Sequence, residues 1–234
     1  AQVPVNAPAT QISAMAAVTE HLGFGVTAAA TFEQPYTLAR RYASLDHLTE
    51  GRVGFNVVTS YLPSAAENQG LPTQIPHDER YEIADEFLDV CYKLWEGSWE
   101  DGAVVKDRER GVYADPSKVH PIGHKGKYFS VPGISLTEPS PQRTPVIFQA
   151  GASSRGQKFS GKHAEAVFIS ALRPDLTRVV TDRIRAAAEE QGRSRDDVKI
   201  LAMLSVIVDE TEEKAKAKYE EYKKYINLDS AQAI

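Results

Sequence analysis

The feature that most constrains the fold of this chain is an alternation of short apolar runs with longer stretches of helical periodicity. Five runs are predicted as strands: 23–30, 51–60, 145–151, 166–170 and 199–208. Each run is short and is bounded by glycine, proline or polar residues, which is typical of a buried strand. Strands that alternate with helices predict an α/β fold with a parallel sheet, either a barrel or an open doubly wound sheet.

Helices are predicted between these strands, because apolar residues there recur every three or four positions. They cover 12–22, 36–48, a segment that begins at 77 or 78, a segment that ends at about 163, 174–192 and a segment that begins at 211. The predicted inward faces of the first three are Ile12, Met15, Ala16, Val18 and Leu22; Leu38, Tyr42, Leu45 and Leu48; and Ile83, Phe87, Val90, Cys91 and Leu94.

The composition is that of one ordinary globular domain, and it excludes several classes of function. Among the 234 residues, 42% are hydrophobic and 25% charged, and the net charge is −5. This charge argues against binding to nucleic acid or to an anionic membrane. The sequence contains no apolar run of about 20 residues, the length that spans a bilayer. Cys91 is the single cysteine, so we expect no internal disulfide and a reducing, cytoplasm-like compartment.

A stretch from about 97 to 143 has no clear periodicity and interrupts the alternation. Loops of this length are uncommon inside a compact domain and are often lids or binding insertions. A complete eight-unit barrel takes about 250 residues, whereas this chain shows five units. We therefore expect one domain over 1–234 that is either an open sheet or part of a barrel.

The strand at 51–60 carries the first candidate binding residues. Asn56 is a polar residue inside an otherwise apolar strand, and a buried amide needs a hydrogen-bond partner. It could bind a ligand inside a barrel, or it could bond to neighbouring backbone. Thr59 and Ser60 end the strand, at the edge where α/β folds place their ligands.

His77 and Tyr81 are the second candidate pair. They are four residues apart, so they share one face at the start of the predicted helix. A helix N-terminus has free N–H groups and a positive dipole, which suit a phosphate. The alternative is a histidine that caps the helix and a tyrosine that packs on the sheet.

Ser153 and Ser154 follow the strand at 145–151 and open the next helix, with Gly151 and Gly156 on either side. Hydroxyl and amide groups in this position can hold phosphate oxygens, but serine is also a preferred N-cap. Arg155 could neutralise a phosphate or face solvent.

A metal site is not expected. His120 and His124 are four apart, but Pro121 and Gly123 disfavour the helical turn that would align them, and no third ligand is evident. We also find no obvious nucleophile or acid–base pair, so no catalytic residue is assigned. This is typical of an enzyme whose cofactor carries the chemistry, and equally of a protein that only binds that cofactor.

Five segments occur together in an order that resembles the bacterial luciferase-like superfamily. They are the segment 35–48, Gly-Arg-Val-Gly-Phe-Asn-Val-Val-Thr-Ser at 51–60, His-Asp-Glu-Arg-Tyr at 77–81, the segment 113–124, and Gln-Ala-Gly-Ala-Ser at 149–153. Within that superfamily, the resemblance is to the branch of nitrilotriacetate and dibenzothiophene-sulfone monooxygenases.

The resemblance implies a TIM-type barrel of which this chain has neither the first two strands nor the last. It also implies reduced FMN and O2 as co-substrates, a separate flavin reductase, a small organic substrate and a homodimer. It favours Asn56, His77, Tyr81, Ser153 and Ser154 as flavin-binding residues. Two alternatives stay open: a flavin-binding relative without turnover, and an oxidoreductase of the same superfamily that uses a deazaflavin.

Overall fold

The computed structural model describes residues 6–151, 153–170 and 173–227. The helices are α1 (Ala9–Ala16), α2 (Pro35–Leu48), α3 (Pro63–Glu67), α4 (His77–Tyr92), α5 (Ser154–His163), α6 (Pro174–Glu190) and α7 (Glu212–Lys223), with shorter helical turns at Lys93–Gly97, Pro116–Lys118 and Arg195–Asp197. The strands are β1 (Phe24–Ala29), β2 (Val53–Val58), β3 (Val104–Asp107), β4 (Val112–Ala114), β5 (His124–Lys125), β6 (Ser130–Val131), β7 (Val146–Gln149), β8 (Ala166–Ser170) and β9 (Lys199–Met203).

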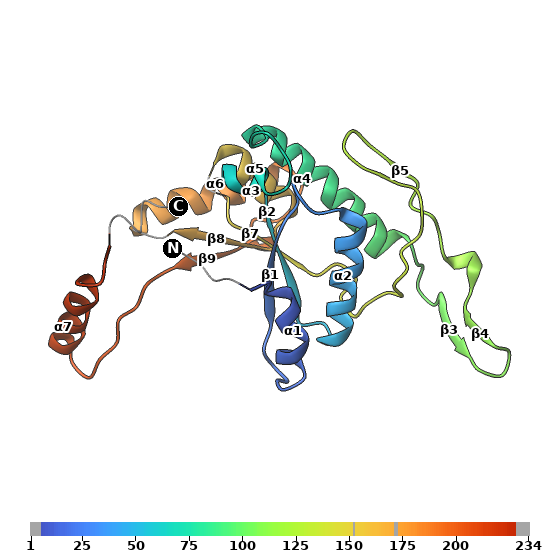
Figure 1. Ribbon diagram of the computed structural model, residues 1–234, viewed down its shortest axis with the longest axis horizontal. Helices are drawn as coiled ribbons and strands as arrows, with labels where there is room; N and C mark the ends of the chain where they lie inside the picture. Colours follow the sequence, from blue (N-terminus) through green and yellow to red (C-terminus); the bar gives the residue numbers. More distant parts are fainter. Residues whose placement is uncertain (1–5, 152, 171–172, 228–234) are drawn as a thin grey trace.

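The five predicted strands form one parallel sheet in the order β1-β2-β7-β8-β9. Helices α4, α5 and α6 lie along one side of the molecule, and α7 stands apart at one end (Figure 1). The register places Thr27 and Phe148 on either side of Asn56, so these three side chains share one face of the sheet. The predicted parallel α/β arrangement is therefore confirmed.

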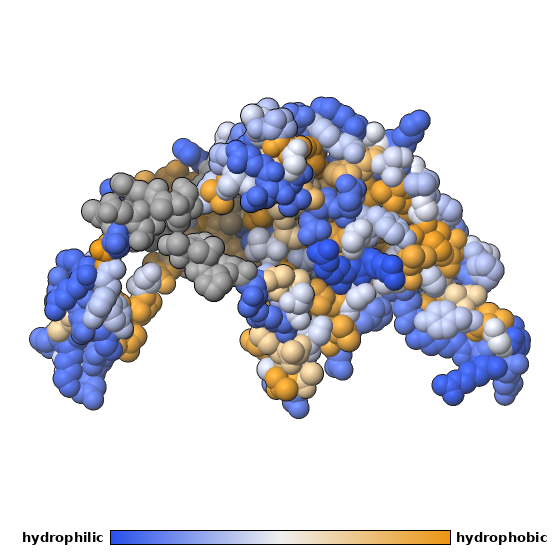
Figure 2. Space-filling view, in the orientation of Figure 1, coloured by the Kyte–Doolittle hydropathy of each residue, from blue (hydrophilic) through white to orange (hydrophobic). Residues whose placement is uncertain are grey.

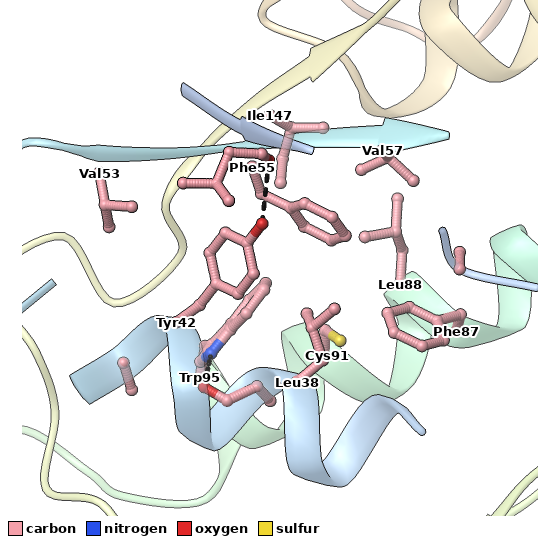
Figure 3. Close-up of a cluster of buried hydrophobic side chains, with 14 of the residues drawn as sticks. Leu38, Tyr42, Val53, Phe55, Val57, Phe87, Leu88, Cys91, Trp95 and Ile147 are labelled. Atoms are coloured by element: carbon pink, nitrogen blue, oxygen red, sulfur yellow. Dashed lines mark hydrogen bonds between the residues drawn. The ribbon is translucent and has the colours of Figure 1, made fainter. Parts of the chain in front are cut away.

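The main core lies between the other face of β1, β2 and β7 and helices α2 and α4. Phe55, Tyr42 and Phe87 are fully buried there, and the rings of Tyr42 and Phe55 are 4.7 Å apart. The Tyr42 hydroxyl donates to the Val26 carbonyl at 2.9 Å, so its polar end is satisfied (Figure 3). Cys91 is buried in the same cluster, as its position on the apolar stripe predicts.

Side chains beneath β8 and β9 form a second, smaller core with α6. It consists of Ala164, Val167, Ile169, Ile184, Ala188 and Val198. Helices α5 and α6 approach closely at Gly161, where an added Cβ would lie 2.5 Å from the backbone carbonyl carbon of Ala187. The glycine at this position is thus a requirement of helix packing.

The insertion at 97–143 is ordered and packs against α4. Its turn at 126–129 points backbone N–H groups at the Glu86 carboxylate, with Phe129 N at 2.8 Å and Lys127 N at 3.0 Å. His124 also donates to Glu86, at 3.1 Å, and the Phe129 ring packs edge-on against Phe87. The insertion therefore contains two short hairpins and is held on α4 by a partly buried carboxylate.

The first predicted helix is too long. The helix ends at Ala16, and Val18 and Leu22 lie beyond it on an exposed segment, 82% and 51% exposed. Leu48 was also expected to face inward but is 61% exposed at the end of α2. Figure 2 shows apolar surface beside polar surface at the tip below α1. The last strand is shorter than predicted, because β9 ends at Met203 rather than at Val208.

Candidate functional site

A cavity of about 550 Å³ opens at the carboxyl ends of β1, β2 and β7. Its lining comes from the ends of these strands, the segment that follows β2 and the first turn of α4. The lining residues are Ala29, Val58, Thr59, Ser60, Tyr61, Leu62, His77, Arg80, Tyr81, Gln149, Ala150, Gly151 and Ser153. This is the edge of a parallel sheet at which α/β folds bind their ligands, as the sequence predicts.

The first turn of α4 places three side chains in the cavity wall, His77, Arg80 and Tyr81. Pro76 precedes the helix and offers no side-chain cap, so the N-terminal N–H groups of α4 lack a capping side chain. His77 does not cap the helix either: its Nδ1 is 2.6 Å from the carboxylate of Asp78, and its ring meets the edge of Tyr81 at 5.2 Å. The capping interpretation of His77 is therefore wrong, and its side chain lies in the cavity wall.

Tyr81 is buried, and its hydroxyl points into a cradle formed by two glycines. A Cβ added to Gly151 or to Gly156 would lie 2.8 Å or 2.7 Å from this hydroxyl oxygen. The ring itself is fixed by Phe159 on one side, at 5.5 Å, and by the Arg155 guanidinium, at 5.5 Å. Glycine at both positions keeps the Tyr81 hydroxyl reachable from the cavity.

Ser153 and Ser154 have different roles. Ser153 lines the cavity, and its hydroxyl accepts a hydrogen bond from the Gly156 N–H at 3.0 Å, so it is also the N-cap of α5. Ser154 is exposed and is not among the cavity-lining residues. The structure thus brings His77, Tyr81 and Ser153 together and leaves Ser154 outside.

Asn56 lies on the open face of the sheet and is not among the cavity-lining residues. Its Nδ2 donates to the Thr27 hydroxyl at 2.9 Å. Its Oδ1 is buried and has no hydrogen-bond partner among the described residues. An acceptor of this kind is costly to leave unpaired, so Asn56 retains capacity to bind a donor on a ligand.

The sequence left two possibilities for Arg155, to neutralise a phosphate or to face solvent. In the structure it does neither, because it pairs with a carboxylate of α4. Its Nη2 is 2.5 Å from the carboxylate of Asp85, which also accepts from Nε2 of His163 at 2.7 Å and pairs with Lys162 at 3.1 Å. Asp85 thereby ties α4 to α5 beside the cavity.

The charges of this cluster follow from its hydrogen bonds. Burial would raise the pKa of Asp85, but the hydrogen bonds from His163 and Arg155 hold that pKa well below its usual value. Burial lowers the pKa of His163 despite the neighbouring carboxylate. A neutral imidazole with its proton on Nε2 can donate to Asp85 and accept from the Tyr92 hydroxyl at Nδ1, 3.1 Å away. His163 is thus a structural residue.

Within the described residues, no group of three or more His, Cys, Asp or Glu side chains could hold a metal ion. His120 and His124 contact different carboxylates, Glu100 at 2.6 Å and Glu86 at 3.1 Å. Over the same described part of the chain, no helix is both long and apolar enough to cross a membrane.

Two cavity residues were missed by sequence reasoning. Arg80 is buried in the cavity wall, one turn along α4 from His77, and that spacing was a signal that could have identified it. Gln149 is buried at the end of β7, and its Oε1 accepts from the Gly151 N–H and the Ser160 hydroxyl, both at 2.5 Å. Nothing in the sequence pattern distinguishes Gln149 from a solvent-facing residue.

The cavity lining named above contains no residue of the insertion at 97–143. The insertion packs on the side of α4 that carries Glu86 and Phe87. That the insertion acts as a lid stays a prediction, which the cavity lining does not support.

Comparison with known proteins gives this geometry its context. The luciferase-like monooxygenase family matches residues 2–233. The chain is 61% identical over 233 residues to dimethyl-sulfide monooxygenase of Hyphomicrobium sulfonivorans, covering 100% of the chain and 48% of that protein. The solved structure of long-chain alkane monooxygenase superposes with a TM-score of 0.94 at 55% identity, covering 97% of this chain and 52% of that one. The chain therefore spans about half the length of these relatives.

Other relatives belong to the branch that the sequence motifs resemble. Dibenzothiophene-sulfone monooxygenase of Rhodococcus erythropolis is 44% identical over 91% of the chain and 47% of its own length. Nitrilotriacetate monooxygenase component A of Aminobacter aminovorans is 42% identical over the same 91% and 47%. A solved structure of riboflavin lyase with modified FMN has a TM-score of 0.90 at 44% identity, covering 94% of this chain and 49% of that one. The predicted family and its TIM-type α/β fold are confirmed.

Proposed function

This chain belongs to the luciferase-like monooxygenase family, and on that premise we propose that it is part of a two-component monooxygenase that uses reduced FMN and O2. The observation that carries the proposal is the cavity at the carboxyl ends of β1, β2 and β7, where His77, Tyr81 and Ser153 converge. A separate flavin reductase would supply the reduced cofactor, and the reaction would oxygenate a small organic substrate.

The residues present fit FMN. Gly151 and Gly156 let the backbone pack close to the Tyr81 hydroxyl, because a Cβ at either glycine would clash with it. This hydroxyl can therefore lie at the cavity, where it would bond to a ligand's polar tail. The uncapped N-terminus of α4 adds N–H groups and positive dipole, which favour a phosphate. The free Oδ1 of Asn56 would accept from a ring N–H of the flavin. Bound reduced flavin would supply the electrons that activate O2, and these side chains would bind and orient it.

For the substrate we propose a small organic sulfide or a similarly apolar molecule. The relative with 61% identity is named for dimethyl sulfide, and the one with 55% identity for a long-chain alkane. The open face of the sheet supports an apolar substrate, because Phe148 and Phe168 stack there with ring centroids 5.6 Å apart. The deazaflavin alternative has weaker support, because coenzyme F420-dependent structures match at 20% and 18% identity, which shows the fold alone.

The function is tested by oxygen consumption in the presence of FMN, NADH, a flavin reductase and dimethyl sulfide. We expect oxygen uptake and substrate loss in a fixed ratio beyond the reductase's own background. Flavin binding without substrate-dependent oxygen uptake would favour the relative without turnover. The reducing, cytoplasm-like compartment inferred from the single cysteine remains part of this proposal.

Removing the Tyr81 hydroxyl is expected to weaken flavin binding. Tyr81→Phe, His77→Ala and Ser153→Ala each delete a hydrogen bond to a charged or strongly polar group, which contributes about 1.5–3 kcal/mol. The dissociation constant for FMN should therefore rise about ten-fold to a hundred-fold in each variant. Ser153→Ala should also cost about 1 kcal/mol of stability, because it removes the N-cap of α5.

Tyr42→Phe is the matched control for these variants. It also deletes one tyrosine hydroxyl, but the lost bond goes to the Val26 carbonyl in the core, away from the cavity. We expect lower stability and unchanged flavin affinity in this variant. Wild-type affinity in both Tyr81→Phe and His77→Ala would remove these two residues from the site.

The homodimer remains a prediction. The small residues Ala16, Ala39 and Ala43 of α1 and α2 are buried within the chain, so they do not offer a surface to a second copy. Val18, Leu22 and Leu48 are instead exposed around the same two helices. We expect a dimer at micromolar concentration by light scattering, and we expect Leu48→Glu to weaken it. A monomeric wild-type protein would contradict this.

A further inference from the structure

Arg80 is a buried cation whose hydrogen bonds are incomplete. It is 7% exposed and is the one lysine, arginine, aspartate or glutamate among the described residues that line the cavity. Its Nη1 donates to the Ser60 carbonyl, and its Nε is buried without a partner in the described part of the chain. No carboxylate pairs with it among the described residues. A guanidinium stays charged at any physiological pH, so this charge needs compensation.

Two other arginines show how this chain satisfies a guanidinium that has no carboxylate. Arg52 donates from Nε to the Thr49 carbonyl at 2.7 Å and from Nη1 to the Leu22 carbonyl at 2.9 Å. Arg193 donates from both terminal nitrogens to backbone carbonyls, each at 2.8 Å. In both, the donors are divided among fixed carbonyls. Arg80 has one such carbonyl, and the remaining N–H groups are available to a ligand.

The surroundings of Arg80 favour an anion. The side chain projects from the first turn of α4, where uncapped N–H groups and the helix dipole add positive potential. Its single acceptor is the carbonyl of Ser60, a non-glycine residue with φ of 55°, in the left-handed region. Such strained residues gather at ligand sites. The guanidinium is thus held at the cavity wall by a strained loop residue while most of its donors remain unused.

We propose that Arg80 recognises the phosphate of FMN and so selects the phosphorylated flavin over riboflavin. The proposal rests on the function proposed above. Arg80 adds the positive charge that His77, Tyr81 and Ser153 do not supply, because those three residues contribute hydrogen bonds. The planar fork of the guanidinium can donate two parallel bonds to one phosphate, which gives geometric specificity as well as charge.

The test compares anaerobically reduced FMN with reduced riboflavin, titrated against wild-type protein, Arg80→Gln, Arg80→Lys and Arg193→Gln. We expect the wild type to bind FMN more tightly than riboflavin. In Arg80→Gln, the affinity for FMN should fall about ten-fold to a hundred-fold, whereas that for riboflavin should stay the same. Arg80→Lys keeps the charge without the fork and should retain part of the preference. Arg193→Gln is the control and should retain all of it.

The outcomes separate this inference from the proposed function. An equal loss of affinity for both flavins in Arg80→Gln would mean that Arg80 acts only through Ser60, which overturns phosphate recognition. An unchanged preference for FMN in a folded Arg80→Gln variant would also overturn it. Both results leave the flavin-dependent function intact. If the wild type binds neither flavin, the proposed function and the inference fail together.

Discussion

Replacing Asp85 with asparagine is expected to lower the free energy of unfolding by about 3 kcal/mol, because it removes one partner of a partly buried ion pair. The Asp85 carboxylate accepts from Arg155 at 2.5 Å and from His163 at 2.7 Å, and it pairs with Lys162. Asparagine keeps the size of the side chain but leaves Arg155 without an anion. The side chain of Lys162 is 42% exposed, so water compensates that charge and the loss stays at the low end of the known range.

Denaturation by urea at pH 7 measures this effect. Asp175→Asn is the matched control, because Asp175 forms an arginine pair of similar length, with Arg173 at 2.5 Å, on the exposed surface. We expect no change in the unfolding midpoint for the control. A similar midpoint for Asp85→Asn and the wild type would show that the α4–α5 link does not stabilise the fold.

The same cluster predicts how stability depends on pH. The folded-state pKa of His163 lies below its ordinary value of 6.5, so the unfolded chain takes up this proton first. The free energy of unfolding should therefore fall as the pH drops below about 6.5, and level off once the folded state is also protonated. The stability that the ionised Asp85 carboxylate contributes is fully present above its ordinary pKa of 3.8. It is lost as the pH falls from there through the lower pKa that Asp85 has in the folded state. His163→Gln should abolish the loss of stability below about pH 6.5 and keep the loss at lower pH that comes from Asp85.

The sheet could be predicted because each strand carries its own local signal. Val53–Val58 and Ala166–Ser170 are short apolar runs between breakers, and both are strands. The end of the first helix could not be predicted in this way, because no glycine or proline separates Ala16 from Leu22. In the structure, Arg52 donates to the carbonyls of both residues, across 36 positions to Ala16 at the end of the helix and 30 positions to Leu22. Periodicity cannot show a contact of this range.

The candidate site shows the same contrast between local sequence signals and contacts between distant positions. His77 and Tyr81 share a helix face, and that spacing alone brings them to one cavity. Arg155 could not be placed, because its partner Asp85 lies 70 positions away on another helix. Ser154 differs from Ser153 by a single position, and the geometry of the N-cap decides which of the two hydroxyls faces inward.

Gly161→Ala is expected to destabilise the protein by about 3 kcal/mol or more, the upper end for overpacking. The added Cβ would lie 2.5–2.7 Å from the carbonyl carbon and oxygen of Ala187 and from the nitrogen of Ala188, all backbone atoms of α6. Backbone cannot rotate away as a side chain can, so α5 and α6 must separate over the buried Ile184. The helix propensity that alanine adds, about 1 kcal/mol, is too small to offset this.

Thermal unfolding measures the effect, and two other glycines give it contrast. Gly133→Ala should change little, because its Cβ would have no heavy atom within 4 Å. Gly156→Ala places its Cβ 2.7 Å from the Tyr81 hydroxyl and 3.1 Å from the Ser153 hydroxyl, so it should weaken FMN binding more than it lowers the melting temperature. Gly161→Ala should show the opposite balance, since its clash lies at the far end of α5 from the cavity. If Gly156→Ala binds FMN as the wild type does, the space beside Tyr81 is not where the flavin's polar tail lies.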